Sequence, residues 1–183
     1  MMKKLIRKKH FNNLGQVWIE TVIYTLIAFV MIGLVLGYAR PKIQEIQDQA
    51  LLKQSTEMLK QIDSTLLSMG SAGNQRILEI SIKKGELKID GELEKIIFEM
   101  ESNTLYSEPG TEITDGSVII LTQEKADTNL VSLTLDYEDD YNLKIQGKDE
   151  LRTLGAGSTP YKISILNEGT DSNGEPIMNI TVS

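Results

Sequence analysis

The sequence predicts an α+β protein in which one long N-terminal helix is followed by an antiparallel β-sandwich-like domain. An apolar run of 23 residues extends from Val17 to Ala39, and helical spacing of apolar residues continues beyond it. From residue 74 onward the pattern changes to the two-residue alternation of strands. We expect three parts: a basic leader (residues 1–15), a transmembrane and stem helix (residues 16–70), and a β domain (residues 71–183).

The leader is strongly basic. Its charged residues are all positive, whereas the rest of the chain has 14 basic and 26 acidic residues, a net charge of −12. By the positive-inside bias, this asymmetry predicts a single-pass protein of the cell membrane, with a cytoplasmic N-terminus and an extracellular C-terminal domain. The basic residues of the leader are Lys3, Lys4, Arg7, Lys8 and Lys9.

The apolar run is long enough to cross a bilayer. Its 23 residues make roughly 34 Å of helix at 1.5 Å per residue. A secretory signal peptide has a shorter apolar region, followed by a small-residue cleavage site, and no such site follows here. We therefore expect the run to stay in the mature protein.

The stem should continue as a helix with one apolar face. Pro41 predicts a kink or local loosening near residues 37–41, after which the helix resumes. Glycines near residue 70 predict its end. The residues predicted to form the packed face are Ile43, Ile46, Ala50, Met58, Ile62, Leu66 and Met69.

Short alternating segments follow, separated by turn residues such as Asp90-Gly91 and Asn173-Gly174. They predict six to eight strands in an antiparallel sheet or sandwich. We expect a surface loop at residues 154–160. The predicted strands are Arg76–Ile82, Glu86–Ile89, Lys95–Glu101, Ser117–Thr122, Leu130–Tyr137, Tyr141–Ile145, Tyr161–Leu166 and Ile177–Val182.

One carboxylate interrupts the apolar run. Glu20 lies five positions after Gly15, and a charge at the bilayer centre costs roughly 2.5–3.5 kcal/mol or more, so it predicts a functional site. The segment Gly15-Gln16-Val17-Trp18-Ile19-Glu20 resembles the signature of type IV pilin-like proteins, and Gln at the first mature position is similar to archaeal pilins and archaellins with class III signal peptides.

The resemblance implies a structural role. In that family a prepilin peptidase cuts after the Gly, here between Gly15 and Gln16, and subunits then assemble into a surface filament through their helices. Glu20 would neutralise the new amine of a neighbouring subunit. The expected partners are therefore the membrane, a prepilin peptidase and other pilin subunits.

Two glycines in the apolar run are spaced for helix packing. Gly33 and Gly37 form a small-xxx-small motif, which lets two helices approach closely. Such motifs are common in membrane helices, so chance occurrence explains the motif at least as well as a specific contact does.

Two patterns in the β domain could bind or be modified. Asn179-Ile180-Thr181 is a sequon, so an exterior placement would make Asn179 a glycosylation acceptor. The acidic run Asp136 to Asp140 could hold calcium, but a solvated hairpin tip explains it as well, and we predict no metal site.

Composition argues against several functions. The chain has no cysteine, and its single histidine is His10, so the β domain has neither a thiol nor an imidazole. We see no nucleophile–base pair and no phosphate-binding loop, and we expect neither an enzyme nor a cofactor. The acidic balance argues against nucleic-acid binding.

Three hypotheses remain open. The first is a structural subunit of a type IV pilus-like filament. The second is an uncleaved, single-pass membrane-anchored β-sandwich module that binds an extracellular partner. The third is a pseudopilin of a secretion machine, which shares the chemistry of the first.

Overall fold

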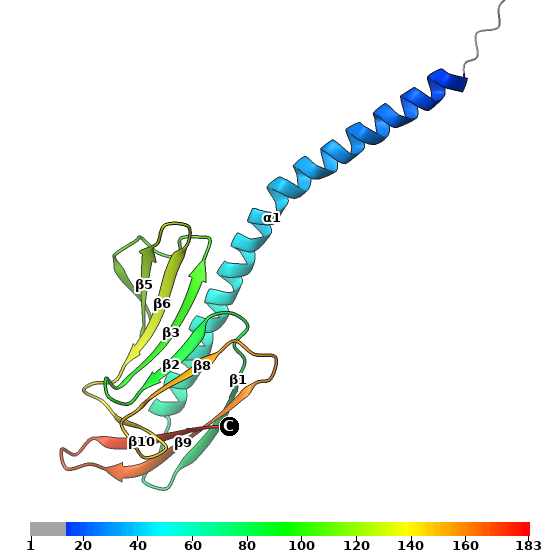
Figure 1. Cartoon of the computed structure of the whole chain (residues 1–183). Coiled ribbons are helices and arrows are strands. Elements are labelled where there is room, and N and C mark those ends of the chain that lie inside the picture. Colours follow the sequence, from blue (N-terminus) through cyan, green and yellow to red (C-terminus); the bar gives the residue numbers. More distant parts are fainter. Residues whose placement is uncertain (1–13) are drawn as a thin grey trace, which may run out of the picture. The chain divides into compact units, whose positions relative to one another are not determined.

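A computed structural model describes residues 14–183, with side chains from Val17 onward. It has one helix followed by ten strands, and it confirms the prediction of a long N-terminal helix before β-sheets (Figure 1). The elements are α1 (Leu14–Leu67), β1 (Gln75–Ile80), β2 (Glu86–Asp90), β3 (Lys95–Ser102), β4 (Glu112–Asp115), β5 (Val118–Glu124), β6 (Asn129–Asp136), β7 (Asn142–Ile145), β8 (Leu151–Gly155), β9 (Tyr161–Thr170) and β10 (Pro176–Val182).

Helix α1 has 54 residues and passes through Pro41 without a break in its helical assignment. It ends at Leu67, and the backbone N–H of Met69 then donates a hydrogen bond to the carbonyl of Leu66 at 3.0 Å. The Asn167 side chain donates to the Gly70 carbonyl at 2.8 Å, which satisfies one acceptor just beyond the helix end.

The chain forms two compact units, and the boundary between them lies within α1, after Ile43. The second unit, Gln44–Ser183, contains the C-terminal half of α1 together with all ten strands.

The first sheet is four-stranded, in the order β1-β9-β10-β7. Strand β1 pairs antiparallel with β9, and β9 with β10, so a strand near the stem joins two near the C-terminus. Strand β7 pairs parallel with β10, from Asn142 beside Ile177 to Ile145 beside Ile180. The expectation of purely antiparallel pairing was therefore wrong at this edge.

The second sheet is six-stranded and antiparallel throughout, in the order β4-β5-β6-β3-β2-β8. Its two edge strands were not predicted, and ten strands exceed the expected six to eight. Strand β8 also takes the first two residues of the expected loop at 154–160, because Leu87 pairs with Leu154 and Glu86 with Gly155.

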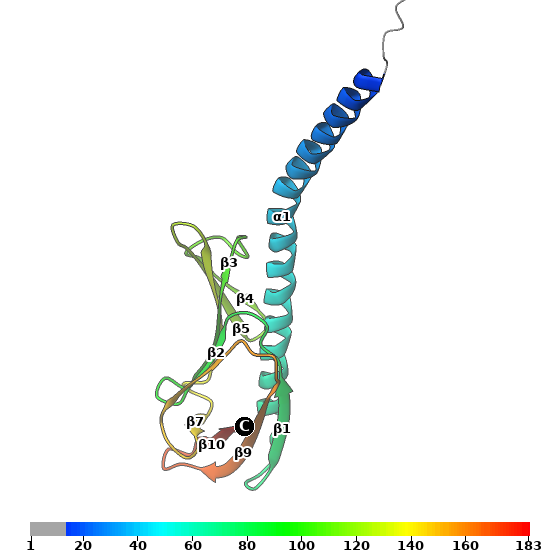
Figure 2. The same cartoon turned by 45° about the vertical axis from the view of Figure 1, so that its right-hand side comes forward.

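One hydrophobic core joins both sheets and the stem. Figure 2 shows β1 beside the C-terminal half of α1. Alternate residues of the central strands, such as β3 and β6, point into the core, as a pleated strand requires. Fully buried members include Leu52 and Leu59 of α1, Phe98 and Leu133 of the second sheet, and Ile165 of the first.

The packed face of the stem differs from the predicted one. Ile62 and Leu66 are buried as expected, but Ile43 and Ile46 are exposed. The buried positions begin instead with Asp48, Leu52 and Thr56, at a spacing of four residues. Two of these are polar, so the apolar pattern could not locate the start of the face.

Candidate functional site

The predicted cleavage site lies at the start of α1. Gly15 and Gln16 are in its first turn, since the helix begins at Leu14. Residues 1–13, which make up most of the predicted leader, lie outside the described residues.

The apolar part of α1 is long and apolar enough to cross a membrane. Its best 18-residue window has a mean hydropathy of 2.3, and none of that window is buried by the chain itself. Large apolar side chains are exposed all round this helix, including Ile19, Leu26, Phe29 and Leu34. A helix that is apolar on every face requires an apolar environment, which lipid or neighbouring helices can supply.

Aromatic side chains mark both ends of this segment. Trp18 is 70% exposed and Tyr38 is 73% exposed. Their 20-residue separation corresponds to about 30 Å of helix, the thickness of a hydrocarbon core. Trp and Tyr are enriched at both membrane interfaces, so the pair fits a transmembrane placement. The sequence analysis missed this signal, although the spacing alone could have revealed it.

The hydroxyl groups near the start of the segment are satisfied within the helix. Thr21 Oγ1 donates to the Val17 carbonyl at 2.9 Å, and Thr25 Oγ1 donates to the Thr21 carbonyl at 2.7 Å. Unsatisfied polar groups are costly in hydrocarbon, so this back-bonding suits a lipid environment.

Glu20 lies among these residues and is exposed. Gly33 and Gly37 lie farther along the same helix, and a Cβ added at either would meet no atom within 4 Å. The helix surface at both glycines is therefore open to a neighbouring backbone, as the small-xxx-small motif requires.

The stem is fixed to the β domain at Asp48, which is only 4% exposed. Its Oδ1 accepts from Lys84 Nζ at 2.5 Å, and its Oδ2 accepts from the Asn103 backbone N–H at 2.9 Å. One buried carboxylate thus ties the helix both to the segment after β1 and to the segment after β3. Such a charge is tolerated inside a protein only when it is paired and hydrogen-bonded.

A second set of polar contacts lies near the end of the stem. Asp63 accepts hydrogen bonds from Tyr137 Oη at 3.0 Å and from Ser117 Oγ at 2.7 Å. Burial, and next the adjacent Asp63 carboxylate, raise the pKa of the Tyr137 phenol. Lys60 Nζ donates to Asp115 at 2.7 Å, and this hydrogen bond raises the pKa of Lys60.

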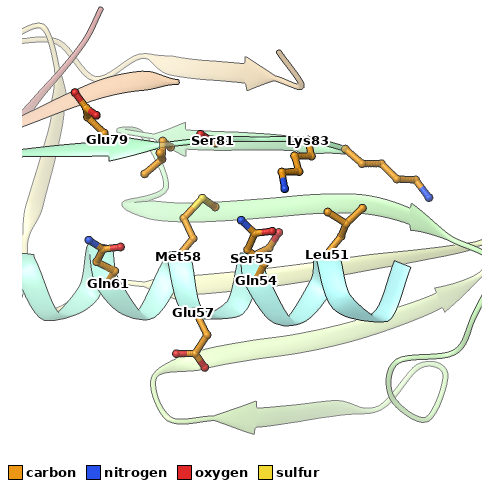
Figure 3. Close-up of a pocket in the computed structure, with 11 residues that line it drawn as sticks. Leu51, Gln54, Ser55, Glu57, Met58, Gln61, Glu79, Ser81 and Lys83 are labelled. Carbon is orange, nitrogen blue, oxygen red and sulfur yellow. The ribbon is translucent and has the colours of Figure 1, made fainter. Parts of the chain in front are cut away.

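A groove of about 330 Å³ lies between the stem and the segment from Glu79 to Lys84 (Figure 3). Leu51, Met58 and Gln61 point from the helix toward that segment, whereas Glu57 points away. Sequence analysis did not find this groove, because its walls come from the stem and from the segment Glu79 to Lys84, which the fold brings together.

The remaining candidates have partners within the β domain. Asn179 donates to Glu168 at 2.6 Å and accepts from Gly147 N–H at 3.0 Å, so its glycosylation stays a prediction. Lys95 forms ion pairs with Asp136 and Glu138 at 2.9 and 3.8 Å. No group of three or more metal-ligating side chains is arranged around a common point within residues 14–183.

Comparison with known proteins gave no match to a family model, a curated protein or a solved structure. The functional argument therefore depends on the residues described above.

Proposed function

We propose that this chain is a structural subunit of a type IV pilin-like surface filament, cut behind Gly15 and assembled through α1. The observation that carries the proposal is the exposed Glu20, the single charged residue in the predominantly apolar helix segment from Val17 to Ala39. A carboxylate in an apolar environment is energetically costly, and pairing with a positively charged group lowers that cost.

Cleavage would create that partner. Cutting the bond between Gly15 and Gln16 gives Gln16 a free amine, which is positive at neutral pH. A carboxylate and an ammonium are each costly in an apolar environment, and much less so when they pair. Glu20 of one subunit would thus receive the amine of the next as stems bundle.

The architecture supports the same reading. The apolar segment of α1 would hold the subunit in the membrane, with its N-terminus in the cytoplasm. The two sheets would form a sandwich-like domain outside, fixed to the stem by Asp48 and Asp63. After assembly the helices would form the filament core and the β domains its surface.

Processing is tested by mass spectrometry of the chain from its native membrane. We expect the mature N-terminus to be Gln16. An intact Met1 in assembled material would contradict the proposal, because no new amine would then exist beside Glu20.

Assembly is tested with Glu20→Ala. We expect normal membrane insertion and a folded β domain but no filaments, because the amine of the incoming subunit would lack its partner. Thr21→Ala is the matched control, since it removes a neighbouring polar group without removing charge. Filaments of normal yield from Glu20→Ala would refute the role assigned to this residue.

A second candidate is an uncleaved, single-pass anchor that presents the β domain to an extracellular partner. The groove beside the stem favours it, because exposed polar side chains line an accessible hollow. This function predicts that the leader is retained and that substitution of Gly15 has no effect on surface display.

A further inference from the structure

The groove between the stem and the segment Glu79 to Lys84 has distinct ends. Most of its lining side chains are polar, and its apolar part, here called the floor, consists of Leu51 and Met58, which are half-buried, and of Ile80, which is buried. Glu79 lies at one end and Lys83 at the other (Figure 3). An apolar floor with one acidic and one basic end selects an occupant by both shape and charge.

At the basic end of the groove, the side chain of Lys83 forms no ion pair within the described residues. Lys84 is paired with the buried Asp48, and Glu79 is paired with Lys162 at 3.7 Å. Within residues 14–183 the ammonium group of Lys83 has no carboxylate at ion-pair distance. Lys83 is also exposed, so it can receive an acidic group from outside the chain.

A complementary feature occurs elsewhere on the same domain, at the turn between β2 and β3. Leu93 is 57% exposed there and follows the exposed Glu92. Asp90 Oδ1 accepts from the backbone N–H groups of Glu92 and Leu93 at 2.9 and 3.0 Å, so the turn is held in one conformation. A preorganised apolar knob beside a carboxylate loses little entropy on binding.

We propose that the groove receives the β2–β3 turn of a second copy of this chain. Leu93 would lie on the floor formed by Leu51 and Met58, and Glu92 would pair with Lys83. This inference rests on the proposed filament function, and it names a contact between the β domains of neighbouring subunits.

Charge favours this occupant. Beyond residue 15 the chain carries a net charge of −12, so two copies repel unless a cation of one meets an acid of the other. The pairing of Lys83 with Glu92 meets that condition. The groove and the turn are different surfaces of one domain, so each copy can contact one neighbour through its groove and another through its turn. Such head-to-tail contacts produce open polymers when the rotation between copies does not close a ring.

The absence of cysteine from the sequence allows a direct test. Two differently tagged full-length copies, one with Ser81→Cys and one with Glu92→Cys, are co-expressed and oxidised in native membranes. We expect a disulfide-linked heterodimer. Lys53→Cys paired with Glu92→Cys is the control, because Lys53 is exposed on the stem beside the groove residues of α1 but does not line the groove itself.

A charge exchange gives the second readout. Lys83→Glu should lower filament yield about tenfold, because two carboxylates would then face each other across the contact. Lys83→Glu combined with Glu92→Lys should restore the yield. Protease resistance of each variant shows that the β domain is folded. Restoration by the double variant is a result that a merely structural role of Lys83 would not give.

The outcomes separate this inference from the proposed function. Normal filaments with no cross-link, a cross-link as strong in the Lys53 control, or a cross-link only to a different protein would overturn the contact. Cross-linked copies that retain the leader and form no filaments would support the contact and refute the proposed function.

Discussion

The phenol of Tyr137 donates a 3.0 Å hydrogen bond to Asp63, a residue of the stem that lies 74 positions earlier in the chain. Ser117 Oγ donates to the other oxygen of the same carboxylate. Through these two bonds a single stem carboxylate holds the start of β5 and the end of β6 against α1.

The burial of Tyr137, together with its contact to Asp63, predicts a loss of stability at alkaline pH. Folding raises the pKa of Tyr137 above its ordinary value of 10.0, so above that pH the unfolded chain releases a proton that the folded chain keeps. The free energy of unfolding should therefore fall as pH rises beyond 10, by at most about 1.4 kcal/mol per pH unit from this group. Denaturant titrations of the detergent-solubilised chain between pH 8 and 11.5 measure it.

Tyr137→Phe should remove this part of the slope and cost about 1–2 kcal/mol at neutral pH, where the hydrogen bond to Asp63 is lost. Ser117→Ala is the matched control. It removes a hydrogen bond to the same carboxylate but no titrating group, so its alkaline slope should equal that of the parent. An unchanged slope in Tyr137→Phe would show that other groups, such as the lysines, cause the whole effect.

Among the polar residues of the stem, substitution of Asp48 should lower the free energy of unfolding the most. Asp48→Ala leaves Lys84 and the Asn103 N–H without their acceptor, and we expect the free energy of unfolding to fall by about 1–3 kcal/mol. The loss is smaller than for a fully buried ion pair because Lys84 is partly exposed. Asp127→Ala, at an exposed acid in the β5–β6 turn, should change stability by less than about 0.5 kcal/mol.

Gly85 occupies a position that no other residue fits. Its φ is +85°, and an added Cβ would collide with the carbonyl oxygen of Glu99 on the neighbouring strand. Gly110 also has a positive φ, +73°, but open space around it. Gly110→Ala should cost about 1–2 kcal/mol from backbone strain alone. Gly85→Ala should cost about 1–3 kcal/mol more, and equal losses in thermal unfolding would refute the steric argument.

The limit of the membrane segment can be mapped with arginine. Leu26→Arg places a charge in the middle of the apolar run, at a cost of about 2.5–3.5 kcal/mol, and should reduce the fraction of chain that resists carbonate extraction. Ile46→Arg is the control, since Ile46 is exposed on the same helix but lies beyond the run. Equal extraction of both variants would argue against a membrane-spanning segment.

Sequence alone located the helix and eight of the ten strands, because long apolar periods and clear alternation report burial directly. It missed β4, whose four residues are all exposed, and β8, in which only Leu154 is buried. Edge strands of this kind exist through backbone pairing with a neighbour, which leaves no hydrophobic pattern.

The candidate functional residues differ in how visible they are in the sequence, and the roles assigned to them stay predictions. Glu20, Gly33 and Gly37 could be selected because a charge or a motif is visible against an apolar background. Asp48 could not, because a carboxylate on a helix usually faces water, and only its pairing with Lys84 and Asn103 explains its burial. Interactions between residues so distant in sequence leave no local signal.

Within residues 14–183, strand β1 pairs with β9 alone, with Gln75 opposite Leu166, and β7 pairs with β10 at the other edge of the sheet. Nearly the entire polypeptide must therefore have been synthesised before the first sheet can close, and contacts of such long range slow folding. Until then the edges of β1 and β7 are open to aggregation. A chain that stops before Tyr161 should consequently be a target for proteolysis rather than a shorter stable domain.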